Sequence, residues 1–241
     1  MNTELQRARA LLAASGDPVV FTGAGVSAES GIPTFRDALT GLWAEYDPET
    51  LATEAGFRAN PSLVWDWYAS RRERIGQAEP NPAHRAIAAI EAARGRVTVV
   101  TQNVDGLHAR AGSSDVVELH GSILRARCLA GCGPASGWEA DLRSPPRCRH
   151  CEAPLRPDVV WFGEWLPHEA VAAAEAAAAR CDLMLVVGTS AQVYPAAELP
   201  FRARRSGAEV IVINPEPTEI DAIASVVLRG RAGEILPALL P

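Results

Sequence analysis

Polar residues that could transfer protons or bind a ligand follow two apolar runs of the chain. Gln102, Asn103 and Asp105 come directly after the strand expected at 97–101. His120 comes directly after a second expected strand at 116–119. Open α/β sheets bind ligands at the carboxyl ends of their strands, and a histidine there suits acid–base chemistry because its pKa lies near neutrality. Capping of the next helix would explain one of the three side chains after the first strand, but not all three.

A glycine-rich turn follows the first apolar run, at 19–22. Gly23 and Gly25 let the backbone turn sharply and approach a ligand, because neither carries a Cβ atom. Amide groups at such a turn form an anion site suited to the pyrophosphate of a dinucleotide. The third position of the usual glycine pattern is Ala28, and the stretch continues to Phe35 and Arg36. An inert turn does not need this aromatic ring and fixed cation, so we expect a phosphate-bearing ligand.

Four of the five cysteines lie within 24 residues. Cys128 and Cys132 are separated by three residues, Cys148 and Cys151 by two, and the pairs by 15. Clustered cysteines in a reducing compartment indicate metal, and two such pairs can supply four thiolates to Zn²⁺. His150 is a poorly placed substitute because it adjoins Cys151. A zinc ion bound by four thiolates has no open coordination position, so it would stabilise the fold and would not take part in catalysis.

Alternating strands and helices must position these groups. Further apolar strands are expected at 182–187 and 209–213, each ending in small or polar residues. The fold class is therefore α/β, with a Rossmann-like parallel sheet, a small zinc-binding module and a helical insertion. We expect the Rossmann-like domain to span 1–36, 78–121 and 158–241. The insertion would span 37–77 and the zinc module 122–157.

Composition limits the classes of partner. The formal net charge of −6 argues against a general polyanion binder, so no direct binding of nucleic acid is expected. Neither a secretory signal nor an apolar run of membrane-spanning length is evident. We expect a protein of the cytoplasm that does not bind membranes.

Taken together, these segments resemble the sirtuin family of NAD-dependent protein deacylases over nearly the whole chain. The resemblance rests on GAGVSAESGIPTFR at 23–36, TQNVDGLH at 101–108, LHG at 119–121, GTS at 188–190 and INP at 213–215, together with the two cysteine pairs. In this order the set is far more specific than any single motif.

The resemblance implies a reaction. The amide oxygen of an acyl-lysine attacks the ribose carbon that bears nicotinamide, and His120 then acts as a general base on a ribose hydroxyl. Products would be nicotinamide, free lysine and an O-acyl-ADP-ribose. Gln102 and Asn103 would assist His120 at the nicotinamide ribose. We expect the enzyme to act as a monomer on acylated proteins or peptides.

The resemblance also implies the binding residues. The NAD-binding set is Gly23, Ala24, Gly25, Ser27, Ile32, Phe35, Arg36, Gln102, Asn103, Asp105, Gly188, Thr189, Ser190, Asn214, Glu216 and Ala232. The set lining the peptide groove is Val160, Phe162, Gly163, Glu164, Val193 and Tyr194. Cys128, Cys132, Cys148 and Cys151 would hold zinc.

Tyr68 and Arg71 resemble the pair that marks class III sirtuins, which remove succinyl and malonyl groups. A guanidinium can bind a carboxylate through two hydrogen bonds, and a tyrosine hydroxyl adds a third. Ala52 falls where this class has a small residue that widens the acyl pocket. The sequence thus predicts a desuccinylase and demalonylase that keeps some deacetylase activity.

Other functions remain open at this level. The enzyme could be mainly a deacetylase or a mono-ADP-ribosyltransferase. A redox dehydrogenase would need an acidic residue about 20 positions after the glycines, and none is clearly placed there. A zinc-bearing sensor that binds ADP-ribose without turnover would have no use for a base at His120.

Overall fold

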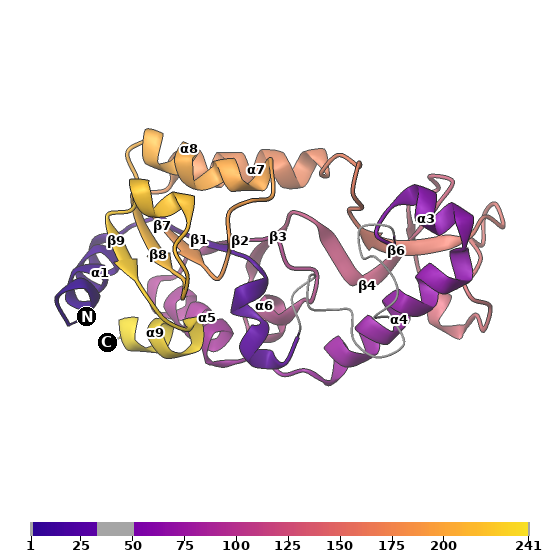
Figure 1. The fold of residues 1–241 in the computed structure, drawn as a ribbon, viewed down its shortest axis with the longest axis horizontal. Helices are drawn as coiled ribbons and strands as arrows, with labels where there is room; N and C mark the ends of the chain where they lie inside the picture. Colours follow the sequence, from indigo (N-terminus) through magenta and orange to yellow (C-terminus); the bar gives the residue numbers. More distant parts are fainter. Residues whose placement is uncertain (1, 33–50, 241) are drawn as a thin grey trace.

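The computed structural model describes residues 2–32 and 51–240. Its centre is a six-stranded sheet, with all neighbouring strands parallel, in the order β3-β2-β1-β7-β8-β9 (Figure 1). The strands are β1 (Pro18–Thr22), β2 (Thr98–Thr101), β3 (Asp115–Glu118), β7 (Leu183–Val187), β8 (Glu209–Ile213) and β9 (Val226–Leu228). The predicted Rossmann-like α/β fold is confirmed. The direction of strand addition reverses between β1 and β7, which is where such sheets bind ligands.

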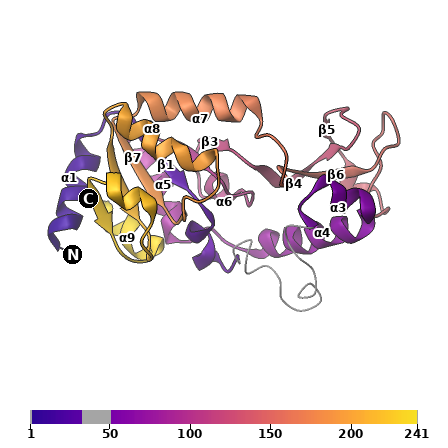
Figure 2. The same ribbon diagram turned by 45° about the horizontal axis from the view of Figure 1, so that its top comes forward.

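Helices cover both faces of this sheet, as Figures 1 and 2 show. One face carries α1 (Asn2–Ala14), α5 (Pro82–Arg94) and α9 (Ala232–Leu239), and the other α7 (His168–Arg180) and α8 (Leu199–Arg205). Val20 points into the first layer, whereas Val19 and Phe21 point into the second. This alternation, with both faces covered, explains why the strands read as continuous apolar runs. α5 begins at the cap Asn81 and ends at Gly95, as its sequence predicts.

A second, antiparallel sheet lies at the other end of the molecule (Figure 2). It consists of β4 (Gly121–Cys128), β5 (Pro134–Ala135) and β6 (Leu155–Val159). Beside it lie α3 (Glu54–Ala59) and α4 (Pro61–Gln77), within the stretch expected to be a helical insertion. The short helix α6 (Leu107–Arg110) connects β2 to β3. None of the helices in 2–32 and 51–240 is long and apolar enough to span a membrane.

The strands β4 and β6 extend beyond the limits of 122–157 expected for the zinc module. The sequence did not reveal them because β4 lacks a regular period of two. A register shift between Ser122 and Ala126 interrupts its pairing with β6, so buried and exposed positions do not alternate.

Candidate active site

Two glycine turns meet where the sheet reverses direction. The Gly23 amide donates to the Val187 carbonyl at 3.2 Å, and the Gly25 amide to the Gly188 carbonyl at 2.8 Å. A Cβ atom on Gly25 would lie 2.8 Å from that carbonyl oxygen. Gly188 has φ +58°, and a Cβ atom there would lie 2.4 Å from the Val26 nitrogen. The turns therefore approach more closely than any side chain permits, and Ala24 begins a 3-10 turn beside them.

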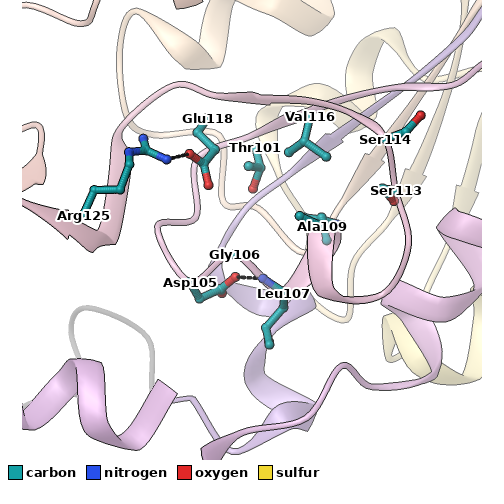
Figure 3. Close-up of a pocket in the computed structure, with 11 residues that line it drawn as sticks. Thr101, Asp105, Gly106, Leu107, Ala109, Ser113, Ser114, Val116, Glu118 and Arg125 are labelled. Carbon is teal, nitrogen blue, oxygen red and sulfur yellow. Dashed lines mark hydrogen bonds and ion pairs between the residues drawn. The ribbon is translucent and has the colours of Figure 1, made fainter. Parts of the chain in front are cut away.

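Ser27 links the glycine turn to the polar residues after β2. The Asn103 side-chain amide donates to Ser27 Oγ at 3.0 Å, and the Ser27 hydroxyl donates to Asp105 Oδ2 at 2.7 Å. Asp105 Oδ1 accepts from the Leu107 amide at 2.9 Å (Figure 3). All three polar side chains are buried. Three of the predicted NAD-binding residues thus form one fixed network.

Sequence reasoning missed a histidine behind this network. His84 Nδ1 accepts from the Asn81 amide, so its Nε2 carries the proton and faces Ser27 Oγ at 3.4 Å. Burial lowers the pKa of His84 to about 4, which keeps the ring neutral at physiological pH. Its place three residues after the helix cap Asn81 was the available signal, because this position commonly bonds back to the cap.

His120 lies at the same edge of the sheet. Its Nδ1 donates to the backbone carbonyl of Gln102 at 2.9 Å, because a carbonyl can only accept. In the neutral ring Nε2 then carries the lone pair, as a general base requires. The Gln102 side chain donates to Thr189 Oγ1 at 3.0 Å, and a Cβ atom on Gly23 would touch Thr189. A chain of contacts thus connects the half-buried His120 to the glycine turn.

The pH dependence of turnover should follow the protonation state of His120. Burial lowers its pKa, and the hydrogen bond to Gln102 opposes this without cancelling it. Protonation removes the lone pair on Nε2, so activity should fall as pH drops through a pKa below the usual value of about 6.5. We expect kcat/KM to stay level around pH 7–8 and to decline only below about pH 6.5. An acid limb centred above pH 7 would contradict this assignment.

The residues expected at the adenosine end lie after β7 and β8. Thr189 is buried, Ser190 and Glu216 are exposed, and Asn214 is half-buried. The Asn214 side-chain amide donates to the Glu216 carbonyl at 2.8 Å. Ala232 begins α9, and the Gly233 amide in the first turn of this helix donates to the Glu29 carboxylate at 2.8 Å. Ile32 is buried, and the predicted contacts Phe35 and Arg36 lie outside the described residues.

The expected acyl-pocket residues share one apolar cluster at the second sheet. Tyr68 and Ala52 are buried there with Trp161 and Ile32. The Trp161 indole N–H donates to the Tyr68 hydroxyl oxygen at 3.1 Å. Arg71 lies one helical turn further along α4, its guanidinium carbon 5.0 Å from the centre of the Trp67 ring. Burial lowers the pKa of Arg71, but a guanidinium remains charged at neutral pH.

The predicted peptide-groove residues lie on two loops. The Val160 amide donates to the His120 carbonyl and the Phe162 amide to the Ala52 carbonyl, both at 2.9 Å. The segment after β6 therefore connects His120 to Ala52, one of the expected acyl-pocket residues. Phe162, Val193 and Tyr194 are large apolar residues that remain exposed. Gly163 has φ +84°, and Glu164 is paired with Arg156, so this carboxylate holds the loop in place.

A cavity of about 300 Å³ lies against β3 and α6 (Figure 3). Asp105 contributes to its wall, and a pair between Arg125 and Glu118 at 2.8 Å lies at its side. The loop carrying Asn103 and Asp105 therefore borders this cavity.

The four clustered cysteines could hold a metal ion. Their sulfur atoms all lie within 4.8 Å of one another, and His150 is not part of the group. Tetrahedral zinc with Zn–S bonds of about 2.3 Å needs sulfur separations of about 3.8 Å, which this cluster can provide. Cys128 and Cys148 are buried in the cluster that supports β4 and β6. The donor set fits Zn²⁺ in a structural role.

Removing zinc should unfold this end of the molecule first. We expect Cys148→Ser to bind less than one zinc per chain and to lower the Tm, since structural zinc contributes folding free energy directly. Metal analysis and thermal unfolding measure both effects, and Cys181→Ser, outside the cluster, is the control. Full zinc content in Cys148→Ser would rule out this ligand set.

The glycine turns meet where the parallel sheet reverses direction, a histidine lies at the same edge, and a four-cysteine cluster lies at the second sheet. These features are typical of an enzyme that acts on a dinucleotide. The profile of the Sir2 family matches residues 23–195, and the chain belongs to this family. This membership confirms the prediction that the protein is a sirtuin. It also confirms that the protein is an NAD-dependent protein deacylase by class and that it uses NAD.

Similar proteins span nearly the whole chain. The "NAD-dependent protein deacylase" of Ralstonia nicotianae is 58% identical over 97% of this chain and 95% of its own length. A solved Sir2 homolog in complex with NAD has a TM-score of 0.90 and 45% identity, covering 97% of this chain and 91% of that one. A Sir2 structure bound to an acetylated peptide has a TM-score of 0.86 and 33% identity, covering 97% and 95%.

Proposed function

We propose that this protein is an NAD-dependent protein-lysine deacylase that prefers succinyl- and malonyl-lysine and keeps some activity on acetyl-lysine. The observation that carries the preference is a buried guanidinium, that of Arg71, one helical turn from the buried Tyr68 hydroxyl and stacked on Trp67 of the same apolar cluster. A neutral acetyl group carries no charge with which a cation at this position could pair. It can pair with the terminal carboxylate of an acidic acyl group.

Different residues of the chain bind the pyrophosphate, seat the ribose and transfer the proton. The glycine turns at Gly25 and Gly188 leave room for the pyrophosphate, and the network of Ser27, Asn103 and Asp105 seats the nicotinamide ribose. His120 Nε2 takes the proton of a ribose hydroxyl, which then attacks the acyl carbon. With one water consumed, the products are nicotinamide, free lysine and an O-acyl-ADP-ribose.

The substrate is an acyl-lysine within an extended peptide. Val160, Phe162, Gly163 and Glu164, on the loop after β6, and the exposed pair Val193 and Tyr194 would bind its backbone as an added strand. A groove that pairs with the peptide backbone contacts few side chains of the substrate, so many acylated proteins can serve as substrates.

Arg71→Met tests the acyl preference. We expect kcat/KM for a succinyl-lysine peptide to fall by about 10- to 100-fold, since hydrogen bonds to a charged group contribute about 1.5–3 kcal/mol. Turnover of the acetyl-lysine peptide should stay within about threefold, because a neutral acyl group does not need the guanidinium. Product release measured by mass spectrometry gives both rates.

Arg72→Met is the matched control, because the guanidinium of Arg72 stacks on Trp65 and Trp138 and donates to the Ile123 carbonyl, whereas that of Arg71 stacks on Trp67. Equal loss on both acyl groups in Arg71→Met would reject the pocket assignment. A wild-type enzyme that turns over only acetyl-lysine would make it a deacetylase.

A further inference from the structure

Trp161 is the hydrogen-bond partner of Tyr68. The indole nitrogen lies 3.1 Å from the Tyr68 oxygen, and both side chains are buried, 2% and 4% exposed. Within residues 2–32 and 51–240, no other hydrogen bond to the Tyr68 hydroxyl is found. Trp161 follows β6 and so comes from a different part of the chain than α4.

The chemistry of the two groups fixes the direction of this bond. An indole N–H can only donate, so the Tyr68 oxygen must accept. The hydroxyl proton of Tyr68 therefore points away from Trp161 and is free to serve a third group. Burial raises the pKa of Tyr68 to about 12, so the hydroxyl keeps that proton at physiological pH.

The Trp161 ring is itself held in place. The Arg156 guanidinium carbon lies 3.4 Å from the ring centre, and the Phe57 ring centroid lies at 5.3 Å. Glu164 pairs with Arg156 and accepts from the Trp161 amide at 2.9 Å. These contacts fix the indole N–H toward Tyr68.

We propose that Trp161 is a positioning residue for acyl selectivity, which turns the Tyr68 hydroxyl into a hydrogen-bond donor for the carboxylate of an acidic acyl group. This inference rests on the proposed function and names a residue that acts through Tyr68 without touching the substrate. It follows that Trp161 matters for succinyl- and malonyl-lysine and not for acetyl-lysine.

Steady-state kinetics of Trp161→Phe test the proposal. We expect the KM for a succinyl-lysine peptide to rise about three- to tenfold with kcat nearly unchanged, as loss of one ordinary hydrogen bond predicts. Acetyl-lysine kinetics should not change. Trp65→Phe removes an equally large ring from α4 on the side facing the zinc module, and should leave both substrates unaffected.

A double-mutant cycle separates positioning from packing. In Tyr68→Phe the donor is already gone, so adding Trp161→Phe should raise the succinyl KM no further. If the phenylalanine variant does not fold, a benzothienylalanine at 161 keeps the ring shape and lacks only the N–H donor. Equal losses on succinyl and acetyl peptides, or additive effects in the cycle, would overturn the role of Trp161 while leaving Arg71 selectivity intact. Absence of succinyl and malonyl turnover in the wild type would overturn both proposals.

Discussion

Replacing His120 with alanine should lower kcat for deacylation by about 10²- to 10⁴-fold, the usual contribution of a positioned general base. The reason is geometric: Nδ1 is committed to the Gln102 carbonyl, so Nε2 is the only ring nitrogen that can accept a proton. NAD affinity should change little, because the glycine turns and the Ser27 network do not depend on the imidazole. Product formation and NAD binding, measured on the same preparation, check both expectations.

The same variant also distinguishes the two halves of the reaction. If the base acts only after nicotinamide has left, His120→Ala should still exchange labelled nicotinamide into NAD in the presence of an acyl peptide. His168→Ala, which changes an exposed histidine at the start of α7, is the control and should be fully active. Deacylation at the wild-type rate in His120→Ala would show that His120 is not the general base.

Gly188→Ala should weaken NAD binding by about 100-fold and lower the Tm by about 6–12 °C. The new Cβ atom would lie 2.4 Å from the Val26 backbone nitrogen, so one of the two turns must move. Strain and overpacking of this kind cost about 3 kcal/mol, which corresponds to the Tm shift for a chain of this size. NAD affinity falls separately, because the displaced turn no longer fits the pyrophosphate, and a misplacement of about 1 Å can cost about 100-fold. Isothermal titration and thermal unfolding measure the two effects.

Gly207→Ala controls for the backbone conformation alone. Gly207 also has positive φ, +98°, but a Cβ atom there meets nothing within 4 Å. It should cost about 1–2 kcal/mol of stability and leave NAD affinity unchanged. If the two alanine variants lost the same NAD affinity, close packing of the glycine turns would not be what shapes the dinucleotide site.

The sequence could predict the sheet and the edge where the polar groups gather. Strands buried on both faces give continuous apolar runs, and the carboxyl ends of parallel strands meet at one edge. For that reason Gly25, Asn103 and His120 could be placed near one another before any contact was known. The cysteine spacing likewise predicted a cluster, because two close pairs need only a short approach to form a tetrahedron.

Contacts between distant segments could not be predicted in this way. β4 was missed because its register shift breaks the period of two on which strand recognition depends. The bond between Trp161 and Tyr68 joins residues that are far apart in the chain, and an apolar ring in a buried run gives no sign of its partner. His84 was missed because a helix-cap histidine and a histidine that supports a cofactor network have the same local sequence.

The most direct test of the proposed desuccinylase activity is mass spectrometry of the products after the wild-type protein is mixed with NAD and a succinyl-lysine peptide. We expect equal amounts of nicotinamide, deacylated peptide and O-succinyl-ADP-ribose. Formation of NADH, or loss of NAD with the succinyl group still on the peptide, would contradict it.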